Sequence, residues 1–303
     1  MRLPFDVEIA AFSDEEGVRF QSTFLGSSAL AGHFDPMLLA RRDAEGISLA
    51  DALQQAGHDP VGIPQLARDP ATVAGFVEVH IEQGPVLLDE SRALGVVTAI
   101  NGAERHSLSI SGLAGHAGTV PMRLRHDAAA AAAEMVLAVE QVARRHDGVV
   151  ATVGKLAVPD GAINVIPGRC ELSIDLRAPD DVLRATAAAE LFASIDAIAE
   201  RRGVSLSRTV VHGVAATPCD PALQQALAAS IGRVAGESEV RHLPSGAGHD
   251  AMMMARLTPV AMLFVRCGNG GISHNPLETM TADDAQIAAA AFIDFLNTLP
   301  VPA

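Results

Sequence analysis

The stretch Phe5–Phe20, F-D-V-E-I-A-A-F-S-D-E-E-G-V-R-F, decides how the rest of the chain is interpreted. Its apolar residues alternate with acidic ones and continue to Phe12, which predicts a core strand of about eight residues. Three adjacent carboxylates follow: Asp14, Glu15 and Glu16. Strand ends in an open α/β sheet border the ligand crevice. Because adjacent carboxylates repel one another, we expect a positive partner here, either a metal ion or a basic group such as Arg19. Taken alone, the triplet is equally compatible with an exposed acidic turn.

Composition excludes several classes of function. The 303 residues are 49% hydrophobic, enough for one large domain or two ordinary ones. A formal net charge of −14 argues against nucleic acid and anionic membranes as partners. The acidic first twelve residues do not resemble a signal peptide, and no apolar run approaches the roughly 18 residues of a membrane span. Three cysteines without a C-x-x-C motif fit a reducing compartment. We therefore expect a soluble cytoplasmic protein.

Local patterns place further elements before residue 101. Residues 48–51, S-L-A-D, resemble a capping box that begins a short helix, which Gly57 ends. Residues 75–82, G-F-V-E-V-H-I-E, predict a strand. Because side chains alternate along a strand, His80 should lie on its polar side together with Glu78 and Glu82.

The pattern changes near residue 102. Strands and helices then follow in the order β-α-β-β-α-β, with helices expected at 127–145 and 180–202. We interpret residues 102–212 as a small domain inserted into a larger α/β domain. The first part of that larger domain would comprise residues 1–101 and its second part residues 213–303, which contain a predicted helix, strand and helix.

Glu and His residues recur where the predicted strands of the larger domain end. They are Glu15, Glu16, His80 and His274. Each histidine taken alone is more often structural, but the set has the composition of a Zn²⁺ or Mn²⁺ site. His33 and Asp35 have the H-x-D ligand spacing, yet no strand precedes them, so we interpret them as a turn that leads into a helix. The histidines outside any motif, among them His106, are expected at the surface.

Six motifs resemble one family along essentially the whole chain. They are D-E-E-G-V-R-F (14–20), H-I-E-Q-G-P (80–85), G-H-A-G-T-V-P-M (115–122), N-V-I-P-G (164–168), S-G-A-G-H-D-A (245–251) and G-I-S-H-N-P (271–276). The chain thereby resembles the hydantoinase/carbamoylase-type dimetal amidohydrolases, which include allantoate amidohydrolases and N-carbamoyl-L-amino-acid hydrolases. The resemblance implies a catalytic α/β domain with an inserted dimerisation and lid domain, a homodimer, and hydrolysis of a ureido or amide C–N bond in a small ureido acid.

The resemblance also implies roles for individual residues around the metal ions. Glu15 would be the general base, and Glu16 and His274 would bind one of two divalent ions, Zn or Mn. His80 would bind the second ion. The family's upstream H-x-D motif and its bridging aspartate are not found in this sequence. We therefore expect three of five metal ligands here, incomplete metal occupancy, and a chain that looks like a family member begun in mid-domain.

Further residues would contact the substrate, as the resemblance implies. Arg177 would hold the substrate carboxylate through a bidentate pair; the alternative is a strand-end arginine paired with Asp175 or Asp180. Asn164, Gln83 and the backbone near Gly248 would line the same pocket. His116 would reach the active site of the partner subunit and stabilise the developing oxyanion.

Two functions from different classes remain open. The first is an amidohydrolase, with allantoate as the leading substrate and N-carbamoyl-L-amino acids as the alternative. The second is a catalytically incomplete chain that only binds ligand or dimerises, which the missing H-x-D motif would favour.

Overall fold

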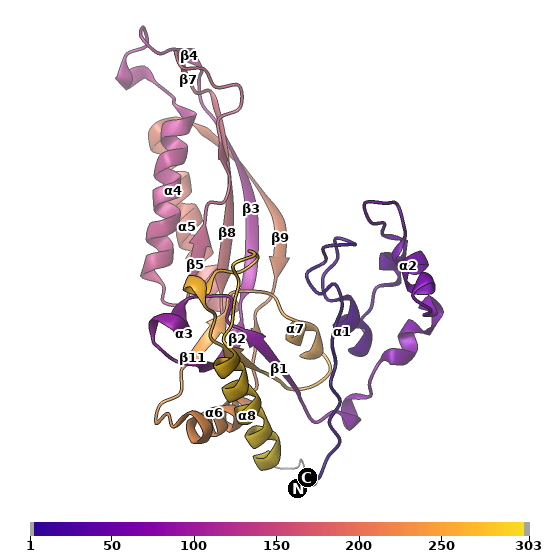
Figure 1. Ribbon diagram of the computed structural model, residues 1–303. Coiled ribbons are helices and arrows are strands. Elements are labelled where there is room, and N and C mark those ends of the chain that lie inside the picture. The colour runs from indigo at the N-terminus through magenta and orange to yellow at the C-terminus, as the bar shows by residue number, and fades with distance from the viewer. Residues whose placement is uncertain (1–2, 300–303) are drawn as a thin grey trace. The chain divides into compact units, whose positions relative to one another are not determined.

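The structure is a computed structural model that describes residues 3–299 (Figure 1). Its contacts divide the chain into two units. Residues 1–100 and 218–303 form the large unit, and residues 101–217 form the inserted unit. The sequence placed the inserted domain at 102–212. The described part of the chain contains no helix that is long and apolar enough to cross a membrane.

A five-stranded sheet organises the large unit. Strand β1 (Phe76–Ile81) pairs in parallel with β12 (Val260–Val265), which pairs antiparallel with β2 (Leu94–Ile100). Strands β10 (Thr217–Pro218) and β11 (His242–Ser245) both pair with β2. Every residue of β12 is buried, which explains its unbroken apolar sequence. Because β1 and β12 run in parallel, the loops that follow them leave from the same edge of the sheet.

Two helices pack against this sheet to form the core of the large unit. Helix α6 (Pro221–Ala235) begins at the N-cap Asp220, and α8 (Ala282–Thr298) begins at the N-cap Thr281. Their apolar faces meet β2 and β12 around the fully buried ring of Phe295 (Figure 1). These two helices and strand β12 match the elements expected after residue 213.

The predicted core strand over residues 5–12 is wrong. Among residues 3–299, this segment forms no ladder with any strand, and its aliphatic side chains are exposed, Ile9 by 92% and Val7 by 45%. Glu8 pairs instead with Arg68 at 2.7 Å. Alternation shows that a segment can present one apolar face, but a strand also needs a partner backbone. The edge strand β1 pairs with β12 and leaves residues 5–12 unpaired.

Short helices follow the acidic turn and connect to β1. They are α1 (Leu25–Leu30), η1 (Pro36–Ala40), α2 (Leu49–Gln55), η2 (Pro60–Leu66) and η3 (Pro70–Thr72). The predicted helix start is confirmed, since Ser48 is the N-cap of α2 and its hydroxyl accepts a hydrogen bond from the Asp51 amide at 3.0 Å. The helix-leading turn is confirmed as well, because Asp35 caps η1 by accepting from the Met37 amide at 2.9 Å.

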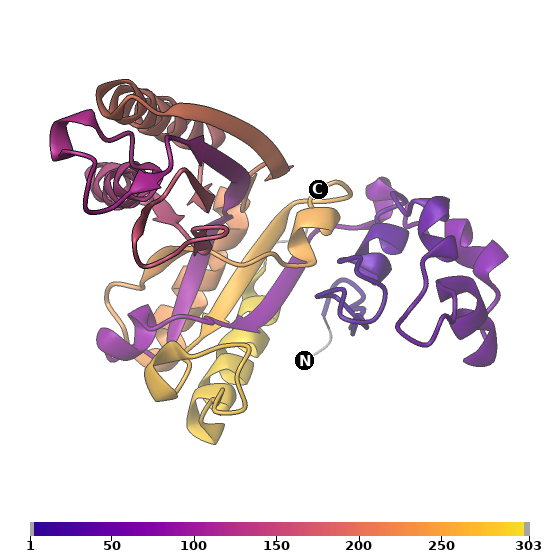
Figure 2. The ribbon, with the colours of Figure 1, turned by 90° about the horizontal axis from the view of Figure 1, so that it is seen from above.

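The inserted unit has the expected β-α-β-β-α-β order. Its antiparallel sheet runs β5-β8-β3-β9, with β6 also on β8. Helices α4 (Ala128–Arg145) and α5 (Asp181–Arg202) lie side by side on one face of this sheet in both views (Figures 1 and 2). The strands are β3 (Gly102–Ser111), β5 (Val150–Thr152), β6 (Leu156–Ala157), β8 (Arg169–Ala178) and β9 (Ser205–Val214). A separate two-stranded ladder joins β4 (Gly115–His116) to β7 (Val165–Ile166), and η4 (Met122–Leu124) lies between β4 and α4 in the chain.

His106 lies in the core of the inserted unit, where we had expected a surface residue. Its ring is buried and packs edge-on against Phe192 of α5, with ring centroids 4.6 Å apart. The strand R-H-S-L-S-I-S alternates, but His106 falls on the same face as Leu108 and Ile110, both of which are fully buried. The pleat therefore places this histidine inside.

Candidate functional site

The acidic turn is held by its own backbone. Asp14 has a left-handed φ of 54°, and its carboxylate accepts from the Arg19 amide at 3.1 Å. Gly17, at φ 70°, donates its amide to the Asp14 carbonyl at 3.0 Å, and a Cβ there would lie 2.8 Å from the Ser22 backbone. The Phe24 amide donates to the Glu15 carbonyl at 3.0 Å. These contacts fix the direction in which Glu15 and Glu16 leave the turn.

Arg19 does not provide the positive partner that the triplet needs. Its guanidinium forms an ion pair with Asp43 at 3.0 Å, while only its backbone amide reaches Asp14. Arg19 is thus engaged by Asp43, and of the two kinds of partner that the sequence left open, this basic group does not serve Glu15 and Glu16.

Glu16 and His274 lie together, as the sequence led us to expect. Oε1 of Glu16 is 3.1 Å from Nε2 of His274, and both side chains are exposed. His274 belongs to the loop after β12 and has a left-handed φ of 55°. This loop is close to the end of β1, because a Cβ on Gly271 would overlap the carbonyl of Gly84. Only glycine at position 271 allows the two loops to approach in this way.

A second cluster surrounds His80 and includes residues that sequence reasoning missed. Ligand atoms of Glu78, His80 and His249 all lie within 4.8 Å of one another. The rings of His80 and His249 meet edge to face at 4.6 Å. The alternation along residues 75–82 already indicated Glu78, because it places Glu78 on the same face of the strand as His80. For His249 and the neighbouring Asp250, the signal was the position of a His-Asp pair inside the glycine-rich motif 245–251.

Electrostatics connect this second cluster to the acidic turn. The pKa of Glu15 is raised to about 7. Burial is the largest cause, the charges of Asp250 and Glu16 also raise the pKa, and the charge of His274 lowers it. Burial likewise raises the pKa of Glu78 to about 7, opposed by the Ala251 amide and reinforced by Asp250 and Glu15. The pKa of the Asp250 carboxyl is also raised by burial. Carboxyl groups packed this closely repel when they are ionised, and a bound cation would relieve the repulsion.

The donor set fits a divalent metal ion. Burial, followed by the charge of His80, lowers the pKa of His249 to about 3, so its ring is neutral at pH 7, the form that binds metals. Oδ1 of Asp250 is buried without a hydrogen-bond partner among residues 3–299. Imidazole and carboxylate together suit zinc and manganese. A group of side chains that can hold a metal ion is therefore present in the large unit.

Two further predicted residues border the same loops of the large unit. The Gln83 side chain donates to the Ser273 hydroxyl at 3.0 Å, next to His274, and its backbone has a left-handed φ of 54°. Gly248 faces the ring of Phe24, since a Cβ on Gly248 would lie 3.0 Å from Cζ of Phe24. The structure thus brings Gln83 beside His274, and it packs Gly248 against the residue whose amide holds Glu15.

The inserted unit carries the other three predicted residues. His116 pairs with Val165 across the β4–β7 ladder, and the Ala117 amide donates to the Asn164 carbonyl at 3.0 Å, so His116 and Asn164 are neighbours. Nδ1 of His116 accepts the Gly118 amide at 3.0 Å. When His116 is neutral, its proton is therefore on Nε2, where the ring is a hydrogen-bond donor.

Arg177 forms a bidentate pair with Asp175. Its Nε and Nη2 atoms donate to the two carboxylate oxygens at 2.6 and 2.9 Å. Arg105 from the neighbouring strand donates to the same carboxylate at 2.8 Å. This is the strand-end pairing that the sequence left open as an alternative, and Asp175 also orients the guanidinium.

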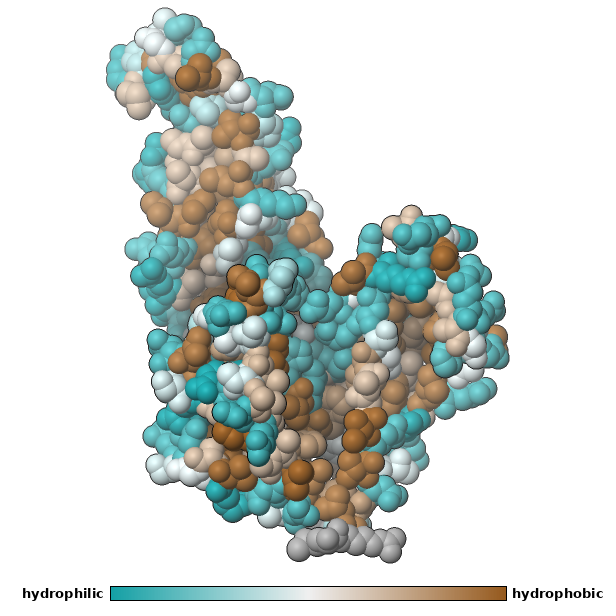
Figure 3. Space-filling model, viewed as in Figure 1, coloured by the Kyte–Doolittle hydropathy of each residue, from teal (hydrophilic) through white to brown (hydrophobic). Residues whose placement is uncertain are grey.

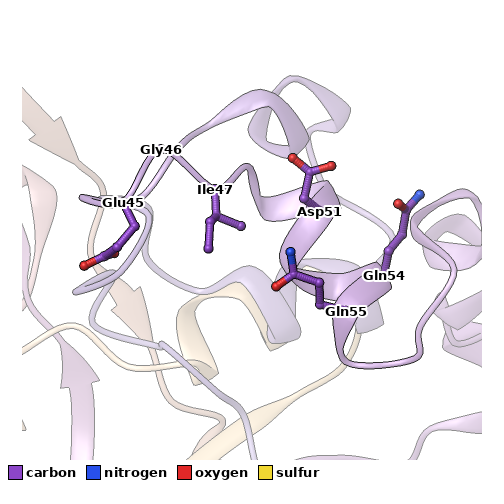
Figure 4. Close-up of a pocket in the computed structure, with 6 residues that line it drawn as sticks. All are labelled: Glu45, Gly46, Ile47, Asp51, Gln54 and Gln55. Atoms are coloured by element: carbon purple, nitrogen blue, oxygen red, sulfur yellow. The ribbon is translucent and has the colours of Figure 1, made fainter.

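A surface hollow of the described chain lies away from these residues. It has a volume of about 460 Å³ and is open to solvent (Figure 4). Its lining residues come from α2 and the loop before it: Glu45, Gly46, Ile47, Asp51, Gln54 and Gln55. None of the predicted site residues is among them. The candidate site is therefore located by the side chains that could hold a metal ion, and not by this hollow.

Comparison with known proteins gives the family. Residues 1–298 match the family model described as Peptidase family M20/M25/M40. The chain belongs to this family. The match covers both units, so the motifs of the inserted unit belong to the same family pattern as the acidic turn.

The curated relatives that this M20 chain resembles include a deiminase and an amidohydrolase. The chain is 43% identical to an allantoate deiminase of Arabidopsis thaliana, covering 96% of this chain and 61% of that protein. It is 42% identical to an N-carbamoyl-L-amino acid amidohydrolase of Geobacillus stearothermophilus, covering 93% and 68%. The chain thus spans about two thirds of the length of these relatives. The prediction of an amidohydrolase family is confirmed.

Solved structures agree with this assignment. A hydantoinase/carbamoylase family amidase from Burkholderia multivorans is 33% identical, with a TM-score of 0.86 over 95% of this chain and 69% of its own. AtUAH in complex with glyoxylate is also 33% identical, with a TM-score of 0.64 over 93% and 68%. The expected mixed α/β fold and the hydantoinase/carbamoylase resemblance are both confirmed.

Proposed function

We propose that the protein hydrolyses a ureido or amide C–N bond of a small carboxylate substrate in a metal-dependent reaction, with allantoate as the leading substrate. The observation that carries the proposal is the placement of Glu15 directly beside the Glu16–His274 pair, with Glu78 and Asp250 in electrostatic range. The names of the relatives support ureido acids as the substrate class. Glyoxylate in AtUAH supports a small carboxylate.

Specific residues of the large unit would hold the two metal ions. Glu16 and His274, 3.1 Å apart, offer an oxygen and a nitrogen to one position. His80 offers a nitrogen to the other. Zinc and manganese both accept this donor set. A divalent ion bound there would supply Lewis-acid polarisation of the scissile carbonyl.

Glu15 would act as the general base. It adjoins a ligand without being needed as one, and burial raises its pKa to about 7. A base whose pKa lies near the working pH can take a proton from the attacking water and later deliver it to the departing nitrogen. Gln83, held by Ser273, and the backbone of Gly248 would contact the substrate near this base.

Residues of the inserted unit would recognise the rest of the substrate. Arg177 would hold the carboxylate, with Asp175 orienting its guanidinium from behind. Asn164 would donate its side-chain amide. His116, with Nδ1 occupied by the Gly118 amide, would donate from Nε2 to the developing oxyanion. The roles of His116 and Asn164 follow the family motifs at 115–122 and 164–168, and the role of Arg177 follows the resemblance stated above for that residue.

A matched pair of arginine variants tests the proposal. Arg177→Lys should raise KM for allantoate or an N-carbamoyl-L-amino acid about tenfold or more, because a charge-assisted hydrogen bond contributes about 1.5–3 kcal/mol and lysine loses the fork. Ammonia release gives the rate, with Zn²⁺ and Mn²⁺ supplied separately. Arg105→Lys is the control, since Arg105 binds the same Asp175 carboxylate.

The outcomes separate the alternatives. If Arg177→Lys and Arg105→Lys affect acids and their amides equally, Arg177 is a structural residue. Faster turnover of N-carbamoyl-L-amino acids than of allantoate would make N-carbamoyl-L-amino acids the leading substrates and allantoate the alternative. No ammonia release from either substrate class, with metal bound, would favour the catalytically incomplete chain that binds ligand or dimerises.

We further propose a cytoplasmic homodimer that assembles through the inserted unit. The free cysteines, all buried, fit a reducing compartment. Strand β9 ends the sheet order of the inserted unit and exposes Val210 and Val211 by 59% and 61%. Brown, hydrophobic side chains lie between hydrophilic ones on the face of this unit seen in Figure 3. An open edge with apolar side chains can pair with a second copy of itself.

The dimer proposal predicts a change in mass. The protein should elute with twice its chain mass of 31.4 kDa, and replacing both Val210 and Val211 with Lys should give the monomer, because charged side chains block edge pairing. Light scattering after size-exclusion chromatography measures this. Val182→Lys, at an exposed position on α5, is the control and should stay dimeric. A wild-type monomer at micromolar concentration would refute the proposal.

A further inference from the structure

The side chain of Gln83 is held in one orientation by a neighbouring loop. Its Nε2 atom donates to the Ser273 hydroxyl at 3.0 Å. The same hydroxyl forms a hydrogen bond with the Glu278 carboxylate, which lowers the pKa of Glu278. An ionised carboxylate can only accept, so the single proton of Ser273 goes to Glu278. The hydroxyl therefore accepts from Gln83, and the nitrogen of the Gln83 amide lies on the side of Ser273.

The oxygen of the same amide is left for another partner. Among residues 3–299, the side-chain oxygen of Gln83 accepts no hydrogen bond, although the side chain is half-buried. The two ends of a carboxamide differ in chemistry, because the nitrogen donates and the oxygen accepts. An amide whose nitrogen is engaged by the protein presents an acceptor to a molecule that binds beside it.

The backbone around Gln83 is fixed as well as its side chain. The Gln83 amide donates to Sγ of the buried Cys267 at 3.2 Å, and Gln83 has a left-handed φ of 54°. Strained backbone of this kind persists only where its surroundings hold it. Glu82, which is only 8% exposed, accepts the first two amides of α3 (Val86–Asp89) at 2.7 and 2.9 Å. Its two oxygens thereby close the loop that carries Gln83.

The chemistry of this oxygen matches one end of a ureido group. A ureido group ends in a carbonyl that bears an amino group, whereas an N-acetyl group has a methyl group in that place and cannot donate. We propose that Glu82 and Ser273 are positioning residues that present the Gln83 oxygen as the acceptor for the terminal amino group of the substrate. Gln83 thereby selects ureido acids over N-acyl amino acids. The inference rests on the proposed function, because it names the substrate group that this loop recognises.

A purely structural role for Gln83 has a different signature. If Gln83 only joined the loops after β1 and β12, its replacement would change stability, or would weaken all ligands alike. The ratio of affinities for two ligands of the same shape changes only if the oxygen contacts the part in which they differ. This ratio is therefore the quantity to measure.

Ligand binding without turnover gives the ratio. In a Glu15→Gln parent, which lacks the proposed general base, calorimetry in the presence of Zn²⁺ would measure Kd for N-carbamoyl-L-alanine and for N-acetyl-L-alanine. These compounds differ only in a terminal amino group against a methyl group. The parent should bind the carbamoyl compound about tenfold more tightly or better, because an acceptor left unpaired opposite a methyl group is costly.

The variants should reduce this preference. Gln83→Leu should bring the two affinities within about threefold of each other, because the acceptor is gone. Ser273→Ala should lower the ratio, since the amide can then rotate. Glu82→Gln should act in the same direction, because a glutamine oxygen replaces only one of the two acceptors. Gln54→Leu and Ser238→Ala, at exposed positions of the same unit, are the controls and should keep the parental ratio.

Opposing outcomes are distinct for the inference and for the proposed function. Equal affinities in the parent, or an unchanged ratio in either Gln83→Leu or Ser273→Ala, would overturn the inference. If Glu82→Gln unfolds, as seen by circular dichroism, Ser273→Ala decides the positioning role. Ammonia release is measured on the protein that retains Glu15. Hydrolysis without the ligand preference would refute this inference alone, and the preference without hydrolysis would refute the proposed function alone.

Discussion

Replacing Glu15 with glutamine should lower kcat by about 10²-fold or more while leaving the bound metal unchanged. The carboxylate is next to Glu16, which contacts His274, so it is within reach of the reacting water without being required as a ligand. Glutamine keeps the size and the half-buried position of the side chain but cannot take up a proton. Steady-state ammonia release and metal analysis by mass spectrometry, on the same preparation, measure the two quantities.

The comparison with Glu16 makes this result specific. Glu16→Gln should lower both metal content and turnover, whereas Glu15→Gln should lower turnover alone. Glu45→Gln, on the surface loop before α2, serves as the control that changes one charge without touching the cluster. Turnover of Glu15→Gln within a few-fold of the wild type would remove Glu15 from the role of general base.

A second large effect is expected from Gly271→Ala, this time on stability. Gly271 has φ 74°, and an added Cβ would overlap the Gly84 carbonyl and the Pro85 nitrogen, which are backbone atoms that cannot turn aside. The loops after β1 and β12 would have to separate. We expect a loss of about 3 kcal/mol or more in the free energy of unfolding. At about 2–4 °C per kcal/mol, the midpoint of thermal unfolding should fall by about 6–12 °C.

The neighbouring glycine provides the control. Gly270 has almost the same φ, 73°, but a Cβ there would meet nothing within 4 Å. Gly270→Ala should therefore cost only the left-handed backbone strain, about 1–2 kcal/mol. Thermal unfolding followed by circular dichroism compares the two variants. Equal midpoints would show that the two loops are not in close contact.

The sequence predicted those parts of the fold in which one pattern determines one element. The helix caps Ser48 and Asp35 and the strand of His80 were confirmed because caps and alternation act over a few residues. The segment 5–12 shows the limit of this reasoning. Its alternation is as clear as that of β1, but strand formation depends on a partner backbone elsewhere in the chain, which alternation does not report.

The residues of the candidate site likewise divide into those that the sequence predicted and those that it did not. The Glu16–His274 contact followed from the family motifs, and so did the position of His80. His249 was overlooked because a histidine in a glycine-rich loop carries no periodicity, and its proximity to His80 arises from the packing of α7 (Ala251–Met254) beside β1. Glu78 was recorded only as part of the polar side of a strand. Burial, which a sequence does not display, is what distinguishes both residues.

The contact between Glu16 and His274 also has a consequence for the order in which the parts of the protein can fold. It joins residues separated by most of the chain, and between them lies the inserted unit, a single continuous segment from 101 to 217. During synthesis, that unit can collapse as soon as it leaves the ribosome, whereas the sheet of the large unit must wait for β12. Contacts between residues so far apart in the sequence form slowly. Hydrolytic competence would therefore appear late, after the inserted unit has already folded.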